Sequence, residues 1–521
     1  MLEDFRNEPF SDFANAEVRS AFEAALARVE RQRGLEVPLV VGGRRLRTGK
    51  ILSNINPADR SEVLSRHHLA DGRTTAKAVA AAAKAQPAWS RVAPRERASV
   101  LLRAAQRMRE RRHDFSATMV LEIGKSWPEA DVETCEATDF LEFYAREMLR
   151  WGGVTADLPV TPYRGEYPQT VYESLGVGAV IPPWNFPNAI LTGMTAAAIV
   201  TGNAVILKPA SDTPLVAWRV FEVLEEAGVP DGVLNYLPGR GAEVGDLLVE
   251  HPDVRFISFT GSKAVGLAIN EKAARLAPGQ RWIKRTVLEM GGKDFIVVDE
   301  DAVFDFAVSQ VVASAFGFQG QKCSACSRAI IHRRLYRRFV DALAAHTEKL
   351  TVGPTRDHRM YMGPVSSERQ MKTVTDYIKL GKREARLVAG GTWDGKKGNF
   401  VRPTVFKDVR PSHRLFKEEI FGPVLSVIEA KDFEHAIQLA NDSEYGLTGS
   451  YFGRDRYRIA EAKQRLHCGN LYINRKCTGA LVGVHPFGGF NMSGTDSKAG
   501  GRDYLGLFLQ AKAISEKLLN K

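Results

Sequence analysis

The sequence has no long apolar run, which removes the simplest route to a membrane-spanning chain. No stretch of the 521 residues approaches the roughly 18 consecutive apolar residues that a spanning helix needs. The first ten residues, MLEDFRNEPF, carry acids and have neither a basic start nor an apolar core. We therefore expect no membrane span, no secretory signal and no transit peptide.

Cysteine is scarce, with five residues scattered along the chain. An odd, dispersed set argues against a disulfide framework and favours the reducing cytoplasm. Cys323 and Cys326 form one CxxC pair, but a second pair is missing. Zinc binding and a thioredoxin-like role therefore stay weak alternatives, and we expect no metal site. Cys326 could also make a reactive neighbour oxidation-sensitive, a hypothesis that a Cys326→Ala variant under mild peroxide would test.

Basic residues outnumber acidic ones, 72 to 61, giving a net charge of +11. The densest basic clusters, residues 44–50 and 333–339, lie outside any motif known to read nucleic acid. We interpret them as solvated basic faces that help to attract anions, and we expect no nucleic-acid partner. A nucleic-acid-binding protein remains the alternative of another class, marked by strongly salt-dependent binding.

From about residue 170, short apolar strands alternate with helices. The segments VGAVIPP, NAVILKP, VLNYL and RFISFTG are the clearest strands, and GAEVGDLLVEH, after VLNYL, is expected to be a helix. A second αβ stretch runs over about residues 291–490, with FIVVDE, AIIHRRL and LSVIEA as its clearest strands. This alternation predicts an α/β fold with parallel sheets and ligands beyond the carboxyl ends of the strands. The helix after NAVILKP is expected to start at Ser211 or Asp212, with Pro214 in its first turn.

The two ends of the chain also carry patterns. Residues 1–50 are expected to be helical and charged, with a helix ending at Gly34, and residues 73–113 read as two amphipathic helices. The tail, residues 498–521, is too apolar for a free end. We expect it to form a β-extension with a hairpin at 161–174, which suggests oligomerisation.

Cys323 lies in GFQGQKCSACSR, between polar residues and glycine. Such neighbours suit an exposed tight turn better than a core strand. Lys322 and exposed backbone N–H groups would favour the thiolate, the reactive form of cysteine. A small buried hydrophobe is the ordinary alternative for a cysteine.

Two further residues could serve a nucleophilic thiol. Glu289 ends the apolar strand TVLEM just before Gly291 and Gly292, where burial would raise its pKa and make it a base. Asn185, in PWNFP, could donate to a developing oxyanion. The alternatives are a solvent-facing acid and a proline-rich turn.

Lys208 ends a strand at a position suited to a ribose or phosphate, and Gly261 and Ser262 precede a helix, a natural pyrophosphate site. The chain has no GxGxxG, so the usual dinucleotide fingerprint is absent. The residues alone thus indicate an α/β enzyme with a nucleophilic cysteine and a nucleotide site.

Taken together, PWNFP, GNAVILKPA, FTGS, LEMGGKD, GQKCSA and EEIFGPV stand in the order and spacing of the aldehyde dehydrogenase superfamily, which the chain resembles over about residues 50–515. The resemblance implies a Rossmann-type cofactor domain, an α/β catalytic domain and a small β oligomerisation flap. The expected boundaries are 1–157 for the N-terminal segment and first part of the cofactor domain, 158–176 for the hairpin, 177–288 for the rest of the cofactor domain, 289–496 for the catalytic domain and 497–521 for the oligomerisation tail.

The resemblance also implies roles. Cys323 would attack the aldehyde to give a thiohemiacetal, while the side chain of Asn185 and the N–H of Cys323 hold the oxyanion. Glu289 would activate the water that hydrolyses the thioester, which favours a free acid as product. Retention of these residues argues against a non-catalytic, structural relative.

The implied cofactor is NAD. Ser211 stands where many NAD-specific members carry glutamate, so NADP remains open beside NAD. The cofactor site is expected to contain Ile181, Pro183, Trp184, Lys208, Ser211, Gly241, Gly245, Phe259, Gly261, Ser262, Gly291, Glu419 and Phe421.

Within the superfamily, GFQGQKCSA, residues 474–501 and the N-terminal extension resemble the branch that oxidises L-glutamate γ-semialdehyde, from Δ1-pyrroline-5-carboxylate, in proline catabolism. Another semialdehyde, such as succinate semialdehyde, is the alternative. The expected substrate residues are Phe186, Ser324, Gly479, Ala480 and Phe487. The implied partners are further copies of the chain, as a dimer or hexamer, and a separate proline dehydrogenase.

Overall fold

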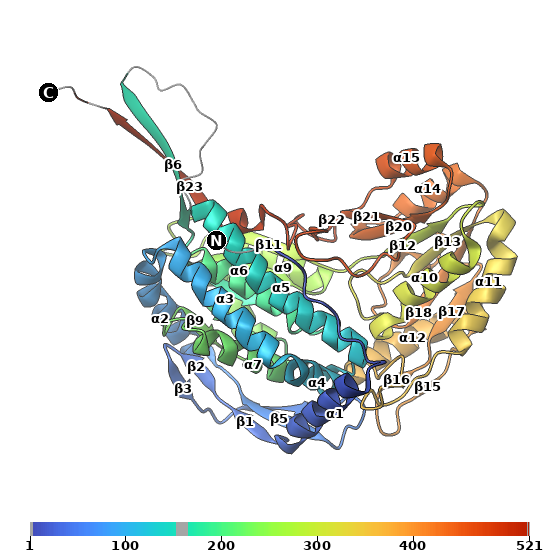
Figure 1. Ribbon diagram of the computed structural model, residues 1–521, viewed down its shortest axis with the longest axis horizontal. Helices are drawn as coiled ribbons and strands as arrows, with labels where there is room; N and C mark the ends of the chain where they lie inside the picture. The colour runs from blue at the N-terminus through green and yellow to red at the C-terminus, as the bar shows by residue number, and fades with distance from the viewer. Residues whose placement is uncertain (1–3, 153–164, 518, 520–521) are drawn as a thin grey trace.

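The computed structural model describes residues 4–152, 165–517 and 519. Figure 1 shows two lobes: blue-to-green elements build one, yellow-to-red elements build most of the other, and a two-stranded ribbon projects from the first. Each lobe has a seven-stranded sheet covered by helices. In the described part of the chain, no helix has the length and apolar character needed to cross a membrane.

The first sheet has the strand order β11-β10-β7-β8-β9-β2-β3. Its first five strands run parallel, and β7 and β8 are buried on both faces, as parallel strands usually are. The antiparallel β2 and β3 come from the N-terminal region. The bounds are β11 Arg285–Glu289, β10 Val254–Thr260, β7 Val177–Ile181, β8 Ala204–Leu207, β9 Leu234–Tyr236, β2 Leu39–Val41 and β3 Arg44–Leu46.

Helices cover both faces of this sheet with separate apolar cores. One face packs against α3 (Pro94–Glu110), α5 (Trp127–Gly152), α6 (Ala189–Val200) and α7 (Pro214–Glu226). The other packs against α2 (Gly72–Ser90), α8 (Asp246–Glu250) and α9 (Lys263–Ala274). Helices α1 (Ala16–Arg31) and α4 (Arg112–Ile123) lie at the lower end of this lobe in Figure 1, near the three-stranded sheet of β1 (Leu35–Val37), β5 (Val63–His68) and β4 (Ile51–Ile55).

The second sheet has the order β14-β17-β18-β13-β12-β20-β21 and is parallel except for β14. The three strands expected from FIVVDE, AIIHRRL and LSVIEA are β12, β13 and β18, so these predictions are confirmed. The bounds are β14 Arg386–Ala389, β17 Thr404–Lys407, β18 Val424–Ala430, β13 Arg328–His332, β12 Phe295–Val298, β20 Thr448–Phe452 and β21 Asn470–Ile473.

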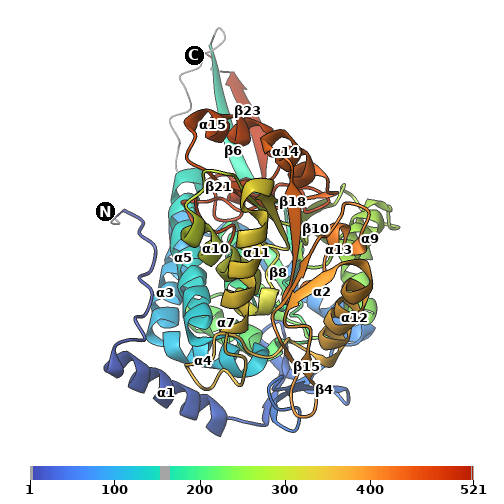
Figure 2. The same cartoon turned by 90° about the vertical axis from the view of Figure 1, so that its right-hand side faces the viewer.

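Helices of the second half enclose this sheet, as the view in Figure 2 shows for α11 and α12. They are α10 (Phe304–Phe316), α11 (Arg333–Glu348), α12 (Glu368–Glu384), α13 (Arg414–Lys417), α14 (Phe433–Asn441) and α15 (Arg456–Arg465). The short elements are the 3-10 turns η2 (Gly317–Gly320) and η3 (Tyr504–Phe508) and the strand pairs β15 (Trp393–Asp394) with β16 (Phe400–Val401) and β19 (Tyr445–Gly446) with β22 (Phe490–Asn491).

The projecting ribbon pairs β6 (Glu166–Ser174) with β23 (Leu509–Lys517) in antiparallel register. The expected pairing of the tail with this segment is confirmed. Residues 166–174 form one strand, whose partner among the described residues is the tail. The other arm of the hairpin expected at 161–174 falls on residues 161–164, which lie outside the described residues, so the hairpin stays a prediction.

Three local expectations need correction. Helix α7 has Thr213 as its N-cap rather than Ser211 or Asp212. Its first N–H groups, those of Leu215 and Val216, donate to the buried carboxylate of Glu122 rather than to the N-cap side chain. Residues 1–50 are not helical throughout, because α1 is preceded by extended chain and followed by strands. The segment expected to be one helix after β9 is a π-helical turn, η1 (Gly241–Gly245), followed by α8.

A buried ion pair joins Lys125, just beyond α4, to Glu133 of α5, and both side chains have 0% exposure. Glu133 Oε1 also accepts the N–H groups of Asn188 (2.8 Å) and Ala189 (3.2 Å), where α6 begins. The carboxylate thus satisfies donors that a helix start otherwise leaves unpaired. The pair therefore fixes the start of α6 against α5.

The Lys125 ammonium also lies between two aromatic rings. Its Nζ is 3.9 Å from the centroid of Phe186 and 4.1 Å from that of Phe318. Phe186 belongs to PWNFP and Phe318 to the turn η2. One buried cation thus contacts two loops that are distant in sequence, at separations typical of cation–π attraction.

We expect Lys125→Met to lower the free energy of unfolding by about 3 kcal/mol, because the Glu133 carboxylate would stay buried without its partner. Urea unfolding followed by tryptophan fluorescence measures this change. The matched control is the double variant Lys125→Met with Glu133→Gln, whose amide oxygen can still accept the N–H groups of α6. The double variant should regain most of the loss, and a double variant as unstable as the single one would contradict this account.

Candidate active site

A cavity of about 410 Å³ lies between the two lobes, lined by α5, α6, the ends of β10 and β11, and loops of the second lobe. It brings together two of the predicted catalytic residues and all five predicted substrate residues. These are Cys323, Glu289, Phe186, Ser324, Gly479, Ala480 and Phe487.

Cys323 follows the tight turn η2, whose geometry is fixed by buried contacts. The φ angles of Phe318 and Gln319 are positive, 48° and 56°, which is unusual for residues with side chains. The Gln319 amide donates to the carbonyls of Gly124 (3.0 Å) and Pro364 (2.8 Å) and so holds the turn in place. At Gly320, a Cβ would lie 2.4 Å from a carbonyl oxygen, so only glycine fits there.

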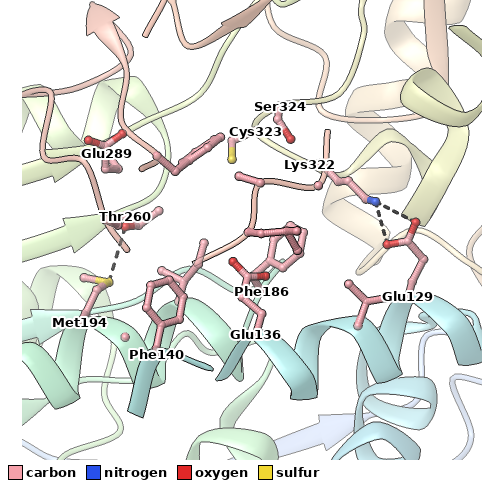
Figure 3. A pocket seen from close by; sticks show the side chains of 18 of the residues that line it. Glu129, Glu136, Phe140, Phe186, Met194, Thr260, Glu289, Lys322, Cys323 and Ser324 are labelled. Atoms are coloured by element: carbon pink, nitrogen blue, oxygen red, sulfur yellow. Dashed lines mark hydrogen bonds and ion pairs between the residues drawn. The ribbon is translucent and has the colours of Figure 1, made fainter. Parts of the chain in front are cut away.

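The expectation that Lys322 stabilises a Cys323 thiolate is wrong. Lys322 Nζ lies 2.7 Å from both carboxylate oxygens of Glu129, and Figure 3 shows it turned away from the sulfur. Cys323 is half-buried rather than exposed. Burial raises the pKa of its thiol, and the nearby carboxylates of Asp294 and Glu419 raise it further. In this structure the residue is therefore a neutral thiol that needs a proton acceptor.

Glu289 ends β11 and has the raised pKa expected from the sequence. Burial raises the pKa of its carboxyl group to about 7, although three hydrogen bonds oppose the shift. They come from Ser497 Oγ (2.7 Å), the Ser497 N–H (3.1 Å) and the Gly489 N–H (3.1 Å). A carboxyl group with this pKa can gain or lose a proton near neutral pH, as a general base must.

Asn185 is buried, and its amide donates to the carbonyl of Gln321 at 3.1 Å. This bond ties PWNFP to the loop that carries Cys323. A primary amide has a second N–H, which is the group that the predicted oxyanion role requires. Asn185 is thus beside the nucleophile loop, while its role stays a prediction.

One face of α5 forms a wall of the cavity that the sequence analysis missed. Glu129, Val132, Glu136, Phe140 and Tyr144 follow one another at spacings of three or four, so they lie on one side of the helix. Burial, together with the nearby carboxylate of Glu133, raises the pKa of Glu136 to about 8. Figure 3 shows Glu136 beside Phe186 in the cavity. The signal available in the sequence was this 3.6-residue period of acidic and aromatic side chains.

The facing wall comes from the loop 475–481. Gly479 has φ 75°, in the region that favours glycine, and its carbonyl accepts a 2.6 Å bond from Arg475. Within the described residues, the N–H groups of Gly479 and Ala480 donate no hydrogen bond, and neither does Ser324 Oγ. Three polar hydrogens are therefore free to bind a ligand.

The predicted cofactor residues gather at the carboxyl edge of the first sheet. They follow neighbouring parallel strands, whose carboxyl ends share one edge. Ile181, Pro183 and Trp184 follow or end β7, Lys208 and Ser211 follow β8, Gly241 and Gly245 follow β9, and Phe259, Gly261 and Ser262 lie at the end of β10 or just beyond.

These residues fit a dinucleotide. Lys208 is buried, which lowers its pKa to about 8, and its Nζ has the Pro209 carbonyl at 3.4 Å. A Cβ on Gly245 would lie 3.8 Å from Lys208 Cε, an ordinary van der Waals contact, so the chain at Gly245 passes close beside this lysine. Ser262 is the N-cap of α9, and its side chain makes no cap bond, which leaves helix N–H groups to meet a phosphate. Ser211 is exposed.

Gly291, Glu419 and Phe421 form a second cluster. A Cβ on Gly291 would lie 2.1 Å from a Glu419 oxygen, so the chain passes the carboxylate at close range. The Gly292 N–H donates to Glu419 at 3.0 Å, and burial raises the pKa of Glu419 to about 7. Phe421 packs edge-on against Trp184 at 5.3 Å, which joins this cluster to the edge of the first sheet. A carboxylate in this place suits the hydroxyl groups of a ribose.

Cys326 is buried in the apolar core of the second lobe, beside Cys477, and all five cysteines are free. The hypothesis that Cys326 makes the nucleophile oxidation-sensitive stays untested. Among the residues that the structure describes, no group of three or more histidine, cysteine or acidic side chains could hold a metal ion.

Comparison with known proteins gives consistent matches over the chain. Residues 46–514 match the model of the aldehyde dehydrogenase family. The 1-pyrroline-5-carboxylate dehydrogenase of Bacillus subtilis (strain 168) is 52% identical over 516 residues, which cover 99% of this chain and 100% of that protein.

Two solved structures are similar over the same range. The crystal structure of 1-pyrroline-5-carboxylate dehydrogenase from Thermus with bound NAD has a TM-score of 0.97 and 49% identity, and covers 99% of both chains. Proline utilization A from Bdellovibrio bacteriovorus has a TM-score of 0.96 and 42% identity over 99% of this chain and 54% of that one.

Proposed function

We propose that this chain, which belongs to the aldehyde dehydrogenase family, oxidises L-glutamate γ-semialdehyde to L-glutamate with NAD. L-Glutamate γ-semialdehyde is the open form of Δ1-pyrroline-5-carboxylate, and its oxidation is a step of proline catabolism. One observation carries the proposal. A single cavity holds the Cys323 thiol, a Glu289 carboxyl group with a pKa near 7, and unpaired polar hydrogens in the loop that faces α5.

The first chemical step forms a bond between Cys323 Sγ and the aldehyde carbon. The thiol gives up its proton to Glu289, and the carbonyl oxygen becomes an oxyanion held by the Asn185 amide and the Cys323 N–H. Bound NAD supplies the two-electron acceptor that converts the Cys323 adduct into a thioester. Glu289 passes the first proton to solvent, and in its ionised form it takes a proton from the water that attacks the thioester. It returns this second proton to the departing Cys323 sulfur, so the free acid and the thiol are released.

The two charged groups of the substrate head meet opposite walls. The N–H groups of Gly479 and Ala480 and the Ser324 hydroxyl bind the α-carboxylate, while Glu136 on α5 faces the α-ammonium. The pair of walls favours an amino-acid semialdehyde over succinate semialdehyde, because succinate semialdehyde has no ammonium and would leave Glu136 buried without a partner.

The cofactor residues support NAD, held by Lys208 and Glu419 at its riboses and by Gly261 and Ser262 at its pyrophosphate. Ser211 is exposed and uncharged, so it does not repel a 2′-phosphate as a carboxylate would. NADP is therefore expected as a second, accepted cofactor.

The ribbon of β6 and β23 supports self-association. Its Tyr167, Val171, Tyr172 and Ile514 side chains are exposed and apolar, which is typical of an interaction surface. We expect a dimer built through this ribbon, with a hexamer as the larger assembly that remains open. A separate proline dehydrogenase is the expected protein partner, since it would make the substrate. Five free thiols suit the reducing cytoplasm.

Purified protein should form NADH with pyrroline-5-carboxylate much faster than with succinate semialdehyde. Cys323→Ala should abolish this activity, because no other group can carry the thioester. Glu289→Gln should lower kcat by about 100- to 10,000-fold, the usual contribution of a general base. Absorbance of NADH at saturating NAD measures all three. Faster turnover of succinate semialdehyde would overturn the substrate assignment, and full activity of either variant would overturn the mechanism.

The rate should depend on the ionisation of Glu289. Because its pKa is raised to about 7 and the base acts when ionised, kcat should rise with pH through about 7 and level off above. Ser497→Ala removes the 2.7 Å bond to the carboxylate, so the pKa should rise and the profile should move about one pH unit toward alkaline values.

The control is Ser309→Ala, whose exposed hydroxyl donates to a carbonyl of its own helix α10. Its profile should match that of the wild type. A profile of Ser497→Ala that is unmoved, or moved toward acidic pH, would contradict the assignment of the rising limb to Glu289.

A further inference from the structure

The N-terminal segment, residues 4–13, lies outside the matched family region and yet reaches the cavity. Figures 1 and 2 show it in dark blue, running along α5 toward α1. It makes few regular backbone bonds, and its position is set by side-chain contacts to α5 and to the loop after Ala480. We call residues 4–13 the N-terminal strap.

Asn7 joins the two walls of the cavity. Its amide nitrogen donates to Asp139 Oδ2 on α5 at 2.9 Å and to the carbonyl of Val482 at 3.0 Å. The Glu8 N–H donates to the other oxygen of Asp139 at 2.8 Å. Asp139 is 3% exposed, so these are hydrogen bonds to a buried carboxylate, which are stronger than ordinary ones.

The rest of the strap is held on both sides of this bridge. Ser11 donates to Asp131 of α5 through its N–H (2.8 Å) and its hydroxyl (2.9 Å). Phe5 packs edge-on against Phe143 at 5.2 Å. It also lies over Gly483, where a Cβ would be 3.1 Å from the Phe5 ring. These contacts give Asn7 a defined position, as a bridging residue requires.

Phe10 brings the strap to the cavity itself. Its ring lines the cavity and is 53% exposed, so it lies at the boundary between the cavity and solvent. An apolar ring at this boundary limits the access of water to the head of a bound substrate.

We propose that the N-terminal strap determines specificity, with Asn7 fixing the spacing of the two walls that bind the substrate head and Phe10 covering that end of the cavity. The inference rests on the proposed function. Asp139 lies one helical turn from Glu136, and Val482 lies two residues beyond Ala480. A bridge between Asp139 and Val482 therefore adds to the packing of Val482 against α5 and helps to set the distance between the group that faces the ammonium and those that bind the carboxylate.

This spacing matters only for a substrate that touches both walls. An amino-acid semialdehyde does so and loses affinity when the walls separate, whereas a simple aldehyde such as hexanal engages Cys323 alone. A strap that served only stability would affect both substrates equally. The ratio of the two reactions therefore distinguishes a specificity role from a structural one.

The test measures KM and kcat of Asn7→Ala with pyrroline-5-carboxylate and with hexanal. We expect the KM for pyrroline-5-carboxylate to rise about tenfold, because the bridge consists of two hydrogen bonds and one is to a carboxylate. The kcat with either substrate and the kcat/KM for hexanal should stay within about twofold, the scatter expected for a change that leaves the transition state intact. Arg6→Ala, at an exposed neighbour, is the matched control and should resemble the wild type.

Phe10→Ala provides a second variant at a half-exposed position, where folding does not depend on the ring. It should raise the KM for pyrroline-5-carboxylate severalfold without changing hexanal oxidation. Unchanged KM values in both variants, or equal losses of kcat/KM for both substrates, would overturn the proposed specificity role of the strap. A wild-type protein that oxidises hexanal and not pyrroline-5-carboxylate would instead overturn the proposed function, and the strap's specificity role with it.

Discussion

The buried ammonium of Lys125 is the interaction on which the geometry of the site depends. It pairs with Glu133, which holds the start of α6, and it lies between Phe186 and Phe318. Phe186 is the residue after Asn185, and Phe318 stands in the turn that leads to Cys323. In a site without water, a cation–π contact can contribute about 2 kcal/mol or more. One cation thus holds the oxyanion loop and the nucleophile loop at a fixed separation.

Burial also shapes the chemistry of the cavity. Burial raises the pKa values of Glu289 and Glu419 to about 7, that of Glu136 to about 8, and the pKa of the Cys323 thiol as well. A carboxyl group with a pKa near 7 is present in both its neutral and its ionised form at physiological pH, so Glu289 can accept a proton and release it again. Lys322 does not offset the burial of the Cys323 thiol, because Glu129 takes both its charge and its hydrogen bonds. Proton transfer from the thiol to ionised Glu289 moves one negative charge from oxygen to sulfur and creates no new charge.

Sequence reasoning could place the predicted cofactor residues on one edge of a sheet because strand ends are local features. Lys208, Gly261 and Ser262 each follow an apolar run, and parallel strands must bring such ends together. Glu289 was found in the same way, by its strand and the glycines that follow. Gly479 and Ala480 came from resemblance alone, since a loop carries no periodic signal.

The residues that sequence reasoning missed act through contacts between distant segments. Lys322 and Glu129 are 193 residues apart, and Asn7 and Val482 are 475 apart. Periodicity shows which face of α5 is buried, but it does not show what that face is buried against. The same limit explains the wrong expectation for Lys322, whose charge was read from its neighbours in sequence rather than from its partner in space.

In the proposed function, the residues that react with the aldehyde are different from those that select the substrate. The thiol, Glu289 and the predicted cofactor residues all belong to the region shared with the family, residues 46–514. In the proposed mechanism they act on any aldehyde carbon that reaches Cys323. To select a substrate by its amino-acid head group, the cavity needs two walls at a set distance. These walls belong to α5 and to a loop more than 300 residues later in the sequence. The two walls are already in contact, because Val482 lies in the same apolar core as Phe140 and Tyr144 of α5, and the Gly500 N–H donates to the Tyr144 hydroxyl at 2.8 Å. The strap adds a polar bridge through Asn7 to this packing without altering the reacting groups.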